Sequence, residues 1–112
     1  MTHDEYIAFH KDACAKMHQI MKDKNSDYCG GDNTSPFSNV EYVEKTGVCS
    51  TEIGILTRMS DKYARLNSFL KKGDYKVKSE SFEDTCLDLA NYALMLAAYA
   101  KHKSEAEKWK KA

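Results

Sequence analysis

The sequence contains few of the residues that interrupt helices. Its 112 residues include one proline and five glycines. It also shows no internal repeat and no strand-like alternation of apolar and polar residues. These absences favour an all-α fold. The length suits a single domain covering residues 1–112.

The chain lacks an excess of charge of either sign. Lys+Arg and Asp+Glu are 17 each, so no long-range field attracts nucleic acid or an anionic membrane. Any affinity for phosphate must therefore be local, and we expect no sequence-specific nucleic-acid partner. Residues 1–5 do not open a signal peptide, and the most apolar stretch, residues 87–100, contains Asp88 and Asn91. We expect a soluble, cytoplasmic protein without a membrane span.

Cysteine pairs with metal-ligand spacing are also missing. The four cysteines are far apart and form no Cys-x-x-Cys pair, and the histidines do not supply the usual zinc spacings. Free thiols in a reducing compartment are the expected state. The cysteines are Cys14, Cys29, Cys49 and Cys86.

Apolar residues at helical spacing predict four helices. The first begins after Thr2, with Glu5 three residues later as in a capping box, and runs to about Lys24. Residues 25–34 are rich in turn formers and predict a loop. The apolar face of the first predicted helix consists of Tyr6, Phe9, Ala13, Met17 and Ile20.

The second predicted helix is short. Ser35 is its expected cap, Pro36 lies in its first turn, and Gly47 ends it. The third starts at Ser50 or Thr51 and ends at Lys72, before Gly73. The expected inward residues are Phe37, Val40 and Val43 in the second helix, and Ile55, Met59, Tyr63, Leu66 and Leu70 in the third.

A polar link over residues 74–78 precedes the fourth predicted helix, which is capped by Ser79 or Ser81 and frays beyond Lys103. Its expected inner face is Phe82, Cys86, Leu89, Ala93, Leu96 and Ala100. Short connections between long amphipathic helices predict an antiparallel bundle of about four helices. Two further aromatic residues of this helix, Tyr92 and Tyr99, lie outside the expected inner face and favour a homo-oligomer.

A charged stripe lies beside the apolar stripe of the third helix. Its members are Arg58, Asp61, Lys62 and Arg65, at positions i, i+3, i+4 and i+7. Such a stripe is a local source of positive charge. Its arginines can hold phosphate oxygens bidentately.

Polar residues also border the apolar face of the fourth helix. Asp84, Asp88 and Asn91 repeat at i, i+4 and i+7, and a buried carboxylate needs a cation or hydrogen-bond donors. One interpretation is a structural network in which Arg58 and Arg65 pair with Asp84 and Asp88. The other is that carboxylates from facing helices hold Mg²⁺, whose remaining ligands are water and substrate phosphates.

A second polar group precedes Gly30–Gly31. Lys24, Asn25, Asp27 and Tyr28 bring a cation, an amide, a carboxylate and an aromatic ring together. They are suited to reading and stacking a base, although a helix stop explains the same composition. The glycine pair is not a P-loop, because it lacks the Gly-Lys-Ser/Thr ending and a preceding strand.

Three blocks of the sequence together resemble a known family. They are Lys24-Asn25-Ser26-Asp27-Tyr28, the segment Arg58–Leu66 (RMSDKYARL) and the segment Glu80–Ala93 (ESFEDTCLDLANYA). In this order they resemble the nucleotide modification associated domain family of bacteriophages. That family in turn is similar to the MazG-like all-α NTP pyrophosphatases, which hold Mg²⁺ on acidic residues of neighbouring helices.

The resemblance implies a MazG-like fold with Asp61, Asp84 and Asp88 as catalytic, metal-binding residues. It places Lys24, Asn25, Asp27 and Tyr28 beside the base or sugar of a nucleotide. The other residues expected to bind the nucleotide are Arg58, Lys62, Arg65 and Asn91. The chain departs from the family pattern in two ways. It lacks the paired glutamates of the MazG-like second helix, and it has Cys29 where a glycine is expected.

Two classes of function follow, with hydrolysis slightly ahead. The protein is either a Mg²⁺-dependent (d)NTP pyrophosphatase of phage nucleotide metabolism, or a sponge that sequesters a nucleotide, such as a host immune signal, without cleaving it. The first departure weakens hydrolysis more than binding. A helical oligomer with a structural role is a third interpretation. In a phage setting the site of action would be the bacterial cytoplasm.

Overall fold

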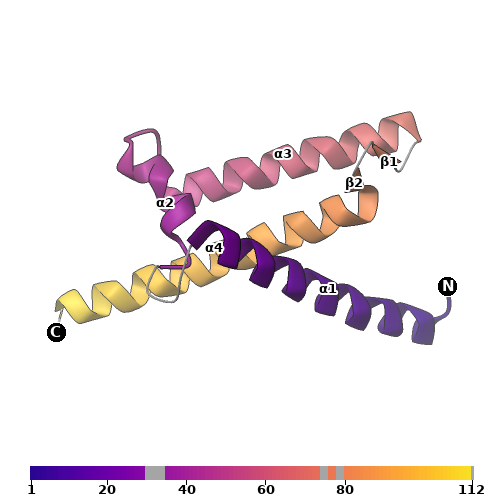
Figure 1. Ribbon diagram of the computed structural model, residues 1–112, viewed down its shortest axis with the longest axis horizontal. Coiled ribbons are helices and arrows are strands. Elements are labelled where there is room, and N and C mark those ends of the chain that lie inside the picture. Colours follow the sequence, from indigo (N-terminus) through magenta and orange to yellow (C-terminus); the bar gives the residue numbers. More distant parts are fainter. Residues whose placement is uncertain (30–34, 74–75, 78–79, 112) are drawn as a thin grey trace. The chain divides into compact units, whose positions relative to one another are not determined.

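The described part of the chain is helical, as predicted. The computed structural model describes residues 1–29, 35–73, 76–77 and 80–111. They form helices α1 (His3–Cys29), α2 (Ser38–Lys45), α3 (Thr51–Lys72) and α4 (Phe82–Lys111), with two short strands, β1 (Lys76–Val77) and β2 (Glu80–Ser81) (Figure 1). None of the described helices is long and apolar enough to cross a membrane.

The chain divides into two compact units, Met1–Pro36 and Phe37–Ala112. The first consists of α1, whose start agrees with the sequence because Thr2 Oγ1 accepts a hydrogen bond from Glu5 N at 3.1 Å. Its end does not agree, since α1 continues past Lys24 to Cys29. Residues 25–29 contain neither glycine nor proline. Compared with alanine, each of these five residues lowers the stability of a helix by less than about 1 kcal/mol. Turn-forming composition alone was therefore too weak to stop the helix.

In the second unit, α2 begins later than predicted. Its N-cap is Phe37, not Ser35, and no side chain caps it. The Phe37 backbone has ψ near 0°, outside the helical region, and its ring packs edge-on against Tyr99 at 5.3 Å between centroids. This tertiary contact accounts for the later start. Gly47, with φ of 80°, follows the end of α2 as expected.

Both ends of α3 agree with the sequence. Ser50 Oγ accepts a hydrogen bond from Ile53 N at 3.2 Å, which settles the N-cap in favour of Ser50. Gly73 adopts a left-handed conformation with φ of 66°, and its N–H donates to Phe69 O at 3.0 Å. Glycine is suited to this position because a Cβ atom is strained at positive φ.

The helices α3 and α4 run antiparallel and pack against each other, joined by the β1–β2 hairpin (Figure 1). The hairpin corrects the expectation of an unstructured polar link, because β1 and β2 form an antiparallel pair. Ser81, one of the two predicted caps, precedes α4 and accepts a hydrogen bond from Asp84 N at 3.0 Å.

The inner face of α3 is rotated from the predicted one. Ile55 and Phe69 are buried, whereas the predicted core residues Tyr63 and Leu70 are 69% and 59% exposed. Buried and half-buried side chains follow alternating steps of four and three residues, the spacing of a helix-packing seam. The seam consists of Ile55, Met59, Lys62, Leu66 and Phe69.

The inner face of α4 also differs from the prediction. Ala93 and Ala100 are exposed, whereas Thr85 and Tyr99 are buried. Tyr99 joins Val40 and Ile55 in the core, so it is not left over for self-association. Tyr92 is half-buried and packs against the same core. Large aromatic side chains bury more apolar area than alanines, which explains the preference.

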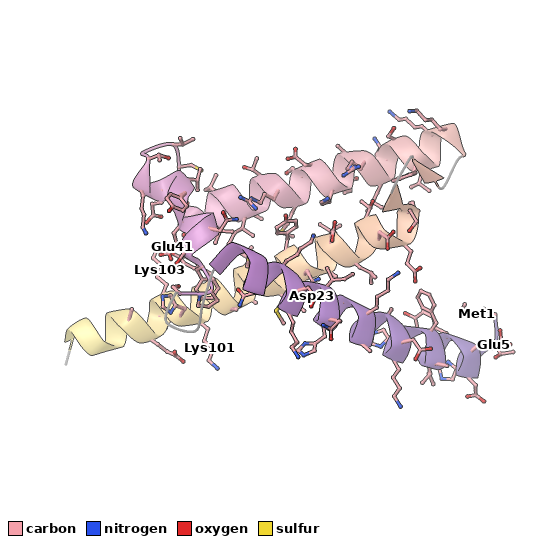
Figure 2. The ribbon with its side chains drawn as sticks, viewed as in Figure 1. Met1, Glu5, Asp23, Glu41, Lys101 and Lys103 are labelled. Carbon is pink, nitrogen blue, oxygen red and sulfur yellow. The ribbon has the colours of Figure 1, made fainter. Side chains whose placement is uncertain are left out.

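A polar contact ties the start of α3 to the distal part of α4. Lys103 Nζ, labelled in Figure 2, lies 2.9 Å from Glu52 Oε2. The hydrogen bond from Lys103 lowers the pKa of Glu52, and the same contact raises the pKa of Lys103. Both side chains remain partly exposed, so water screens the pair and it contributes little to stability.

The contact between α2 and α3 depends on Gly54. A Cβ atom at this position would lie 2.7 Å from Val43 Cγ1, and a β-branched valine has little rotamer freedom to move away. We expect Gly54→Ala to lower the free energy of unfolding by about 1–2 kcal/mol, despite the better helix propensity of alanine. In a Val43→Ala background the same change should be neutral or stabilising. Urea unfolding of the wild type, the two single variants and the double variant measures both effects, and equal costs in the two backgrounds would contradict the close contact.

Candidate anion-binding site

The charged stripe of α3 lines a hollow on the second unit. The hollow has a volume of about 320 Å³ and is bordered by Arg58, Asp61, Lys62, Arg65 and Tyr92. The four α3 residues share one face because they lie three or four residues apart. The structure thus brings together the four predicted residues of the stripe and adds one aromatic residue from α4.

Tyr92 is the site residue that the sequence interpretation missed. It was assigned to self-association, but it lies half-buried between the core and the hollow. The available signal was its position four residues after Asp88, which places both side chains on the same face of α4. A tyrosine ring beside cations offers a nucleotide both a flat apolar surface and a hydroxyl group.

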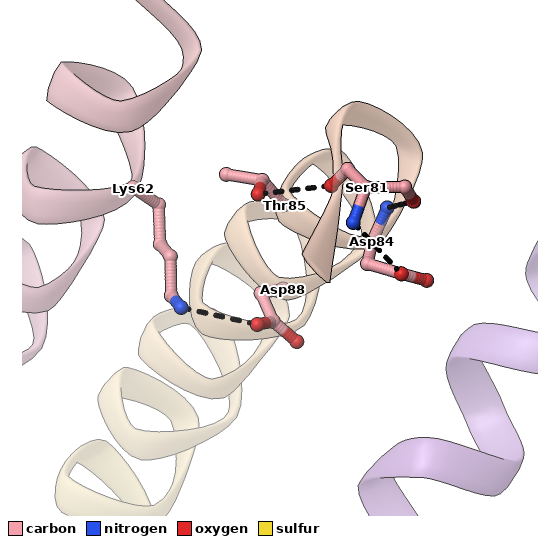
Figure 3. Close-up of polar contacts among 5 residues, drawn as sticks. All are labelled: Lys62, Ser81, Asp84, Thr85 and Asp88. Carbon is pink, nitrogen blue, oxygen red and sulfur yellow. Dashed lines mark hydrogen bonds and ion pairs between the residues drawn. The ribbon is translucent and has the colours of Figure 1, made fainter. Parts of the chain in front are cut away.

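The lysine of the stripe forms the ion pair that joins α3 to α4. Lys62 Nζ lies 3.1 Å from Asp88 Oδ2, with the two side chains 17% and 14% exposed (Figure 3). A cation for Asp88 was predicted, with arginine as the expected partner. Lysine takes this role because position 62 lies on the packing seam of α3, where its ammonium reaches across to the neighbouring helix.

Asp84 has a local structural role. Its Oδ2 accepts a hydrogen bond from Ser81 N at 3.2 Å, while Asp84 N donates to Ser81 Oγ (Figure 3). This reciprocal arrangement is a capping box that satisfies the first turn of α4. Thr85 continues the cap, since its hydroxyl donates to Ser81 O at 3.2 Å. The spacing Ser81-x-x-Asp84 was the sequence signal for this role.

The structure does not gather the three predicted catalytic carboxylates into a metal site. Asp61 lines the hollow, Asp84 caps α4 and Asp88 pairs with Lys62. Among the residues that the structure describes, no group of three or more His, Cys, Asp and Glu side chains could hold a metal ion. In this arrangement Mg²⁺ would have to displace the Lys62 ammonium from Asp88. The described residues therefore do not fit the ion, and the magnesium prediction rests on the sequence alone.

The remaining predicted residues are not brought to the hollow by any described contact. Asn91 is half-buried on α4 but does not line it. Lys24 and Asn25 are exposed on α1, which belongs to the other unit. The side chains of Asp27 and Tyr28 lie outside the described residues. The proposed base-reading group therefore stays a prediction.

The cysteines have no evident place in this chemistry. Cys14, Cys49 and Cys86 are free thiols, as predicted, and Cys29 is not among the described side chains. Burial, and secondarily the charge of Glu83, raises the pKa of Cys86. A raised pKa disfavours the nucleophilic thiolate. Cys86 is thus better suited to packing than to catalysis.

The charge of the hollow favours an anionic ligand. Three of its lining side chains are basic and one is acidic, and with Lys62 paired to Asp88 the two arginines still outnumber Asp61. Arginine offers planar, bidentate donors that match phosphate and carboxylate oxygens. No known protein family, curated protein or solved structure matches this chain. A function can therefore be inferred only from the chemistry of the hollow.

Proposed function

We propose that the protein binds a nucleotide at the hollow between α3 and α4 and holds it without cleaving it. The observation that carries this proposal is the convergence of Arg58, Lys62 and Arg65 beside the ring of Tyr92. The arginines would bind phosphate oxygens and the tyrosine would contact the base or sugar. This function corresponds to the nucleotide sponge, which the sequence offered as the alternative to hydrolysis.

The arrangement of the carboxylates favours holding over hydrolysis. Cleavage of a phosphoanhydride by the predicted route needs a metal on clustered acidic residues. Asp84 and Asp88 are instead engaged in a helix cap and an ion pair. Binding of phosphate requires only the cations, which are already on one face of α3.

The biological setting follows from the sequence resemblance to the phage family. On that basis we propose that the ligand is a nucleotide used as a signal in host immunity and that the protein acts against this defence in the bacterial cytoplasm. Mg²⁺-dependent pyrophosphatase activity is the second candidate. It is supported by the same resemblance.

The test is a nucleotide panel analysed for both binding and turnover. The purified protein is incubated with linear and cyclic nucleotides, with Mg²⁺ or with EDTA, and filtered. The filtrate and the ligand released by heating the protein are then analysed by chromatography and mass spectrometry. We expect one class of nucleotide to be retained and released intact, equally in both buffers.

The other outcomes have distinct meanings. Cleaved products that appear only with Mg²⁺ would establish the pyrophosphatase and overturn the sponge. Retention that requires Mg²⁺, without products, would contradict the metal-independent binding proposed for the hollow. If no nucleotide is retained or cleaved, the nucleotide proposal is wrong and a structural role is favoured.

A further inference from the structure

A thiol and an imidazole ring meet on the surface of α1. Cys14 Sγ lies 3.7 Å from Nδ1 and 3.9 Å from Nε2 of His10. The two residues are four apart, so they occupy successive turns on the same side of the helix. Helical side chains lean toward the N-terminus, which brings Cys14 over the turn that carries His10. Both residues are exposed, so a ligand can reach them from solvent.

Sulfur and imidazole nitrogen are together the ligands of a thiophilic cation. Cysteine thiolate and neutral histidine hold Zn²⁺ in proteins, and they also suit other late transition metals. Hard cations such as Mg²⁺ and Ca²⁺ take oxygen ligands instead. The pair on α1 therefore selects a different class of ion from the one predicted for the carboxylates of α3 and α4.

The separation of the two donor atoms matches the spacing around one tetrahedral ion. With a Zn–S bond of about 2.3 Å, a Zn–N bond of about 2.0–2.1 Å and an angle of about 109°, the two ligand atoms stand about 3.5–3.6 Å apart. The observed 3.7 Å between Sγ and Nδ1 is only slightly longer. Chelation therefore needs a small adjustment of the two side chains and no change in the backbone of α1.

His10 and Cys14 supply two of the four ligands of such an ion. Among the residues that the structure describes, no third His, Cys, Asp or Glu side chain joins them in a metal-binding group. The other coordination positions face solvent, because both residues are exposed. Water fills open positions of this kind on protein-bound zinc.

We propose that His10 and Cys14 form a two-ligand site for a thiophilic divalent cation such as Zn²⁺, with water in the open positions. In the metal-free chain the same contact is a hydrogen bond. On binding, the thiol proton passes to solvent and a metal–thiolate bond forms, with no change of oxidation state. The site lies within α1, so it depends neither on the hollow of the second unit nor on the proposed function.

Titration of the reduced, metal-free, full-length protein with cobalt chloride tests the site. Charge transfer from thiolate to Co²⁺ gives an absorption band that only sulfur ligation produces. We expect a single equivalent of Co²⁺ per chain to saturate this band and Zn²⁺ to remove it, because Zn²⁺ binds such ligands more tightly. Loss of even an outer-shell partner of a metal ligand costs about 10–100-fold in affinity, so Cys14→Ser and His10→Ala should each cost at least as much.

The matched controls are Cys49→Ser and His3→Ala. Cys49 belongs to the second unit, and His3 lies about 16 Å from Cys14 along the helix axis, so both variants should bind like the wild type. Alkylation of Cys14 by iodoacetamide, mapped by mass spectrometry, gives a second measurement. Zn²⁺ should protect Cys14 in the wild type and leave it reactive in His10→Ala. Circular dichroism checks that each variant remains helical.

Three results would overturn the proposal. The first is the absence of the cobalt band in the wild type, or a band of full strength in Cys14→Ser. The second is a His10→Ala variant that binds as tightly as the wild type, which would leave the contact between His10 and Cys14 as a hydrogen bond only. The third is saturation at one ion per two chains, which would contradict a site with water in its open positions.

Discussion

Replacing Lys62 by methionine is expected to lower the free energy of unfolding by about 2–4 kcal/mol. Methionine keeps most of the apolar stem that packs on the seam but removes the ammonium that lies 3.1 Å from Asp88. The Asp88 side chain is only 14% exposed, so water solvates the carboxylate poorly once this cation is gone. Removing one partner of a largely buried pair is costly for this reason. Chemical denaturation at neutral pH measures the loss.

The double variant and a second ion pair provide the controls. In Lys62→Met/Asp88→Leu both charges are replaced by apolar groups, and stability should return to within about 1 kcal/mol of the wild type. Lys103→Met breaks the more exposed pair with Glu52 and should change stability far less than Lys62→Met does. Equal losses for Lys62→Met and Lys103→Met would show that burial of Asp88 does not govern the effect.

The helix ends that could be predicted are those fixed by local chemistry. Thr2, Ser50, Gly73 and Ser81 act within a few residues of their own positions, and the structure confirms each one. The end of α1 was placed too early because turn formers disfavour a helix only weakly. The delayed start of α2 depends on Tyr99, which is far from Phe37 in the sequence.

The inner face of α3 could not be chosen from periodicity alone. The helix carries two apolar stripes that share the same repeat, one through Phe69 and one through Tyr63 and Leu70. The correct seam includes Lys62, which looks out of place until Asp88 on α4 is known to meet it. A pattern within one helix cannot supply that information, because it concerns the facing helix.

The candidate site could also be predicted only where its residues share one helix. The stripe of Arg58, Asp61, Lys62 and Arg65 follows from spacing on one helix, and the structure gathers it in one hollow. The contribution of Tyr92 from α4 depends on how the two helices are aligned. The described residues do not gather the predicted carboxylates into one group, since Asp84 caps the N-terminus of its own helix and Asp88 pairs with Lys62.

Arg58→Ala is expected to weaken nucleotide binding about 10–100-fold. A charge-assisted hydrogen bond to phosphate contributes about 1.5–3 kcal/mol, and each 1.4 kcal/mol corresponds to a tenfold change in affinity. The dependence of affinity on salt should decrease as well, because one fewer cation meets the ligand. Lys71→Ala is the control, since Lys71 lies in the last turn of α3 and does not line the hollow. Calorimetry with the nucleotide retained in the panel measures both variants.

Asp61→Asn separates an anion site from a metal site, because the two predict opposite changes. Asp61 is the one acidic residue among those lining the hollow, so its charge opposes an anionic ligand. At an anion site, asparagine should raise nucleotide affinity by about threefold to tenfold, equivalent to about 1 kcal/mol between partly solvated charges. At a magnesium site it removes a ligand and should abolish Mg²⁺-dependent binding. Weaker binding in Asp61→Asn, with Arg58→Ala unchanged, would show that the stripe holds a metal and that phosphate does not meet the arginines.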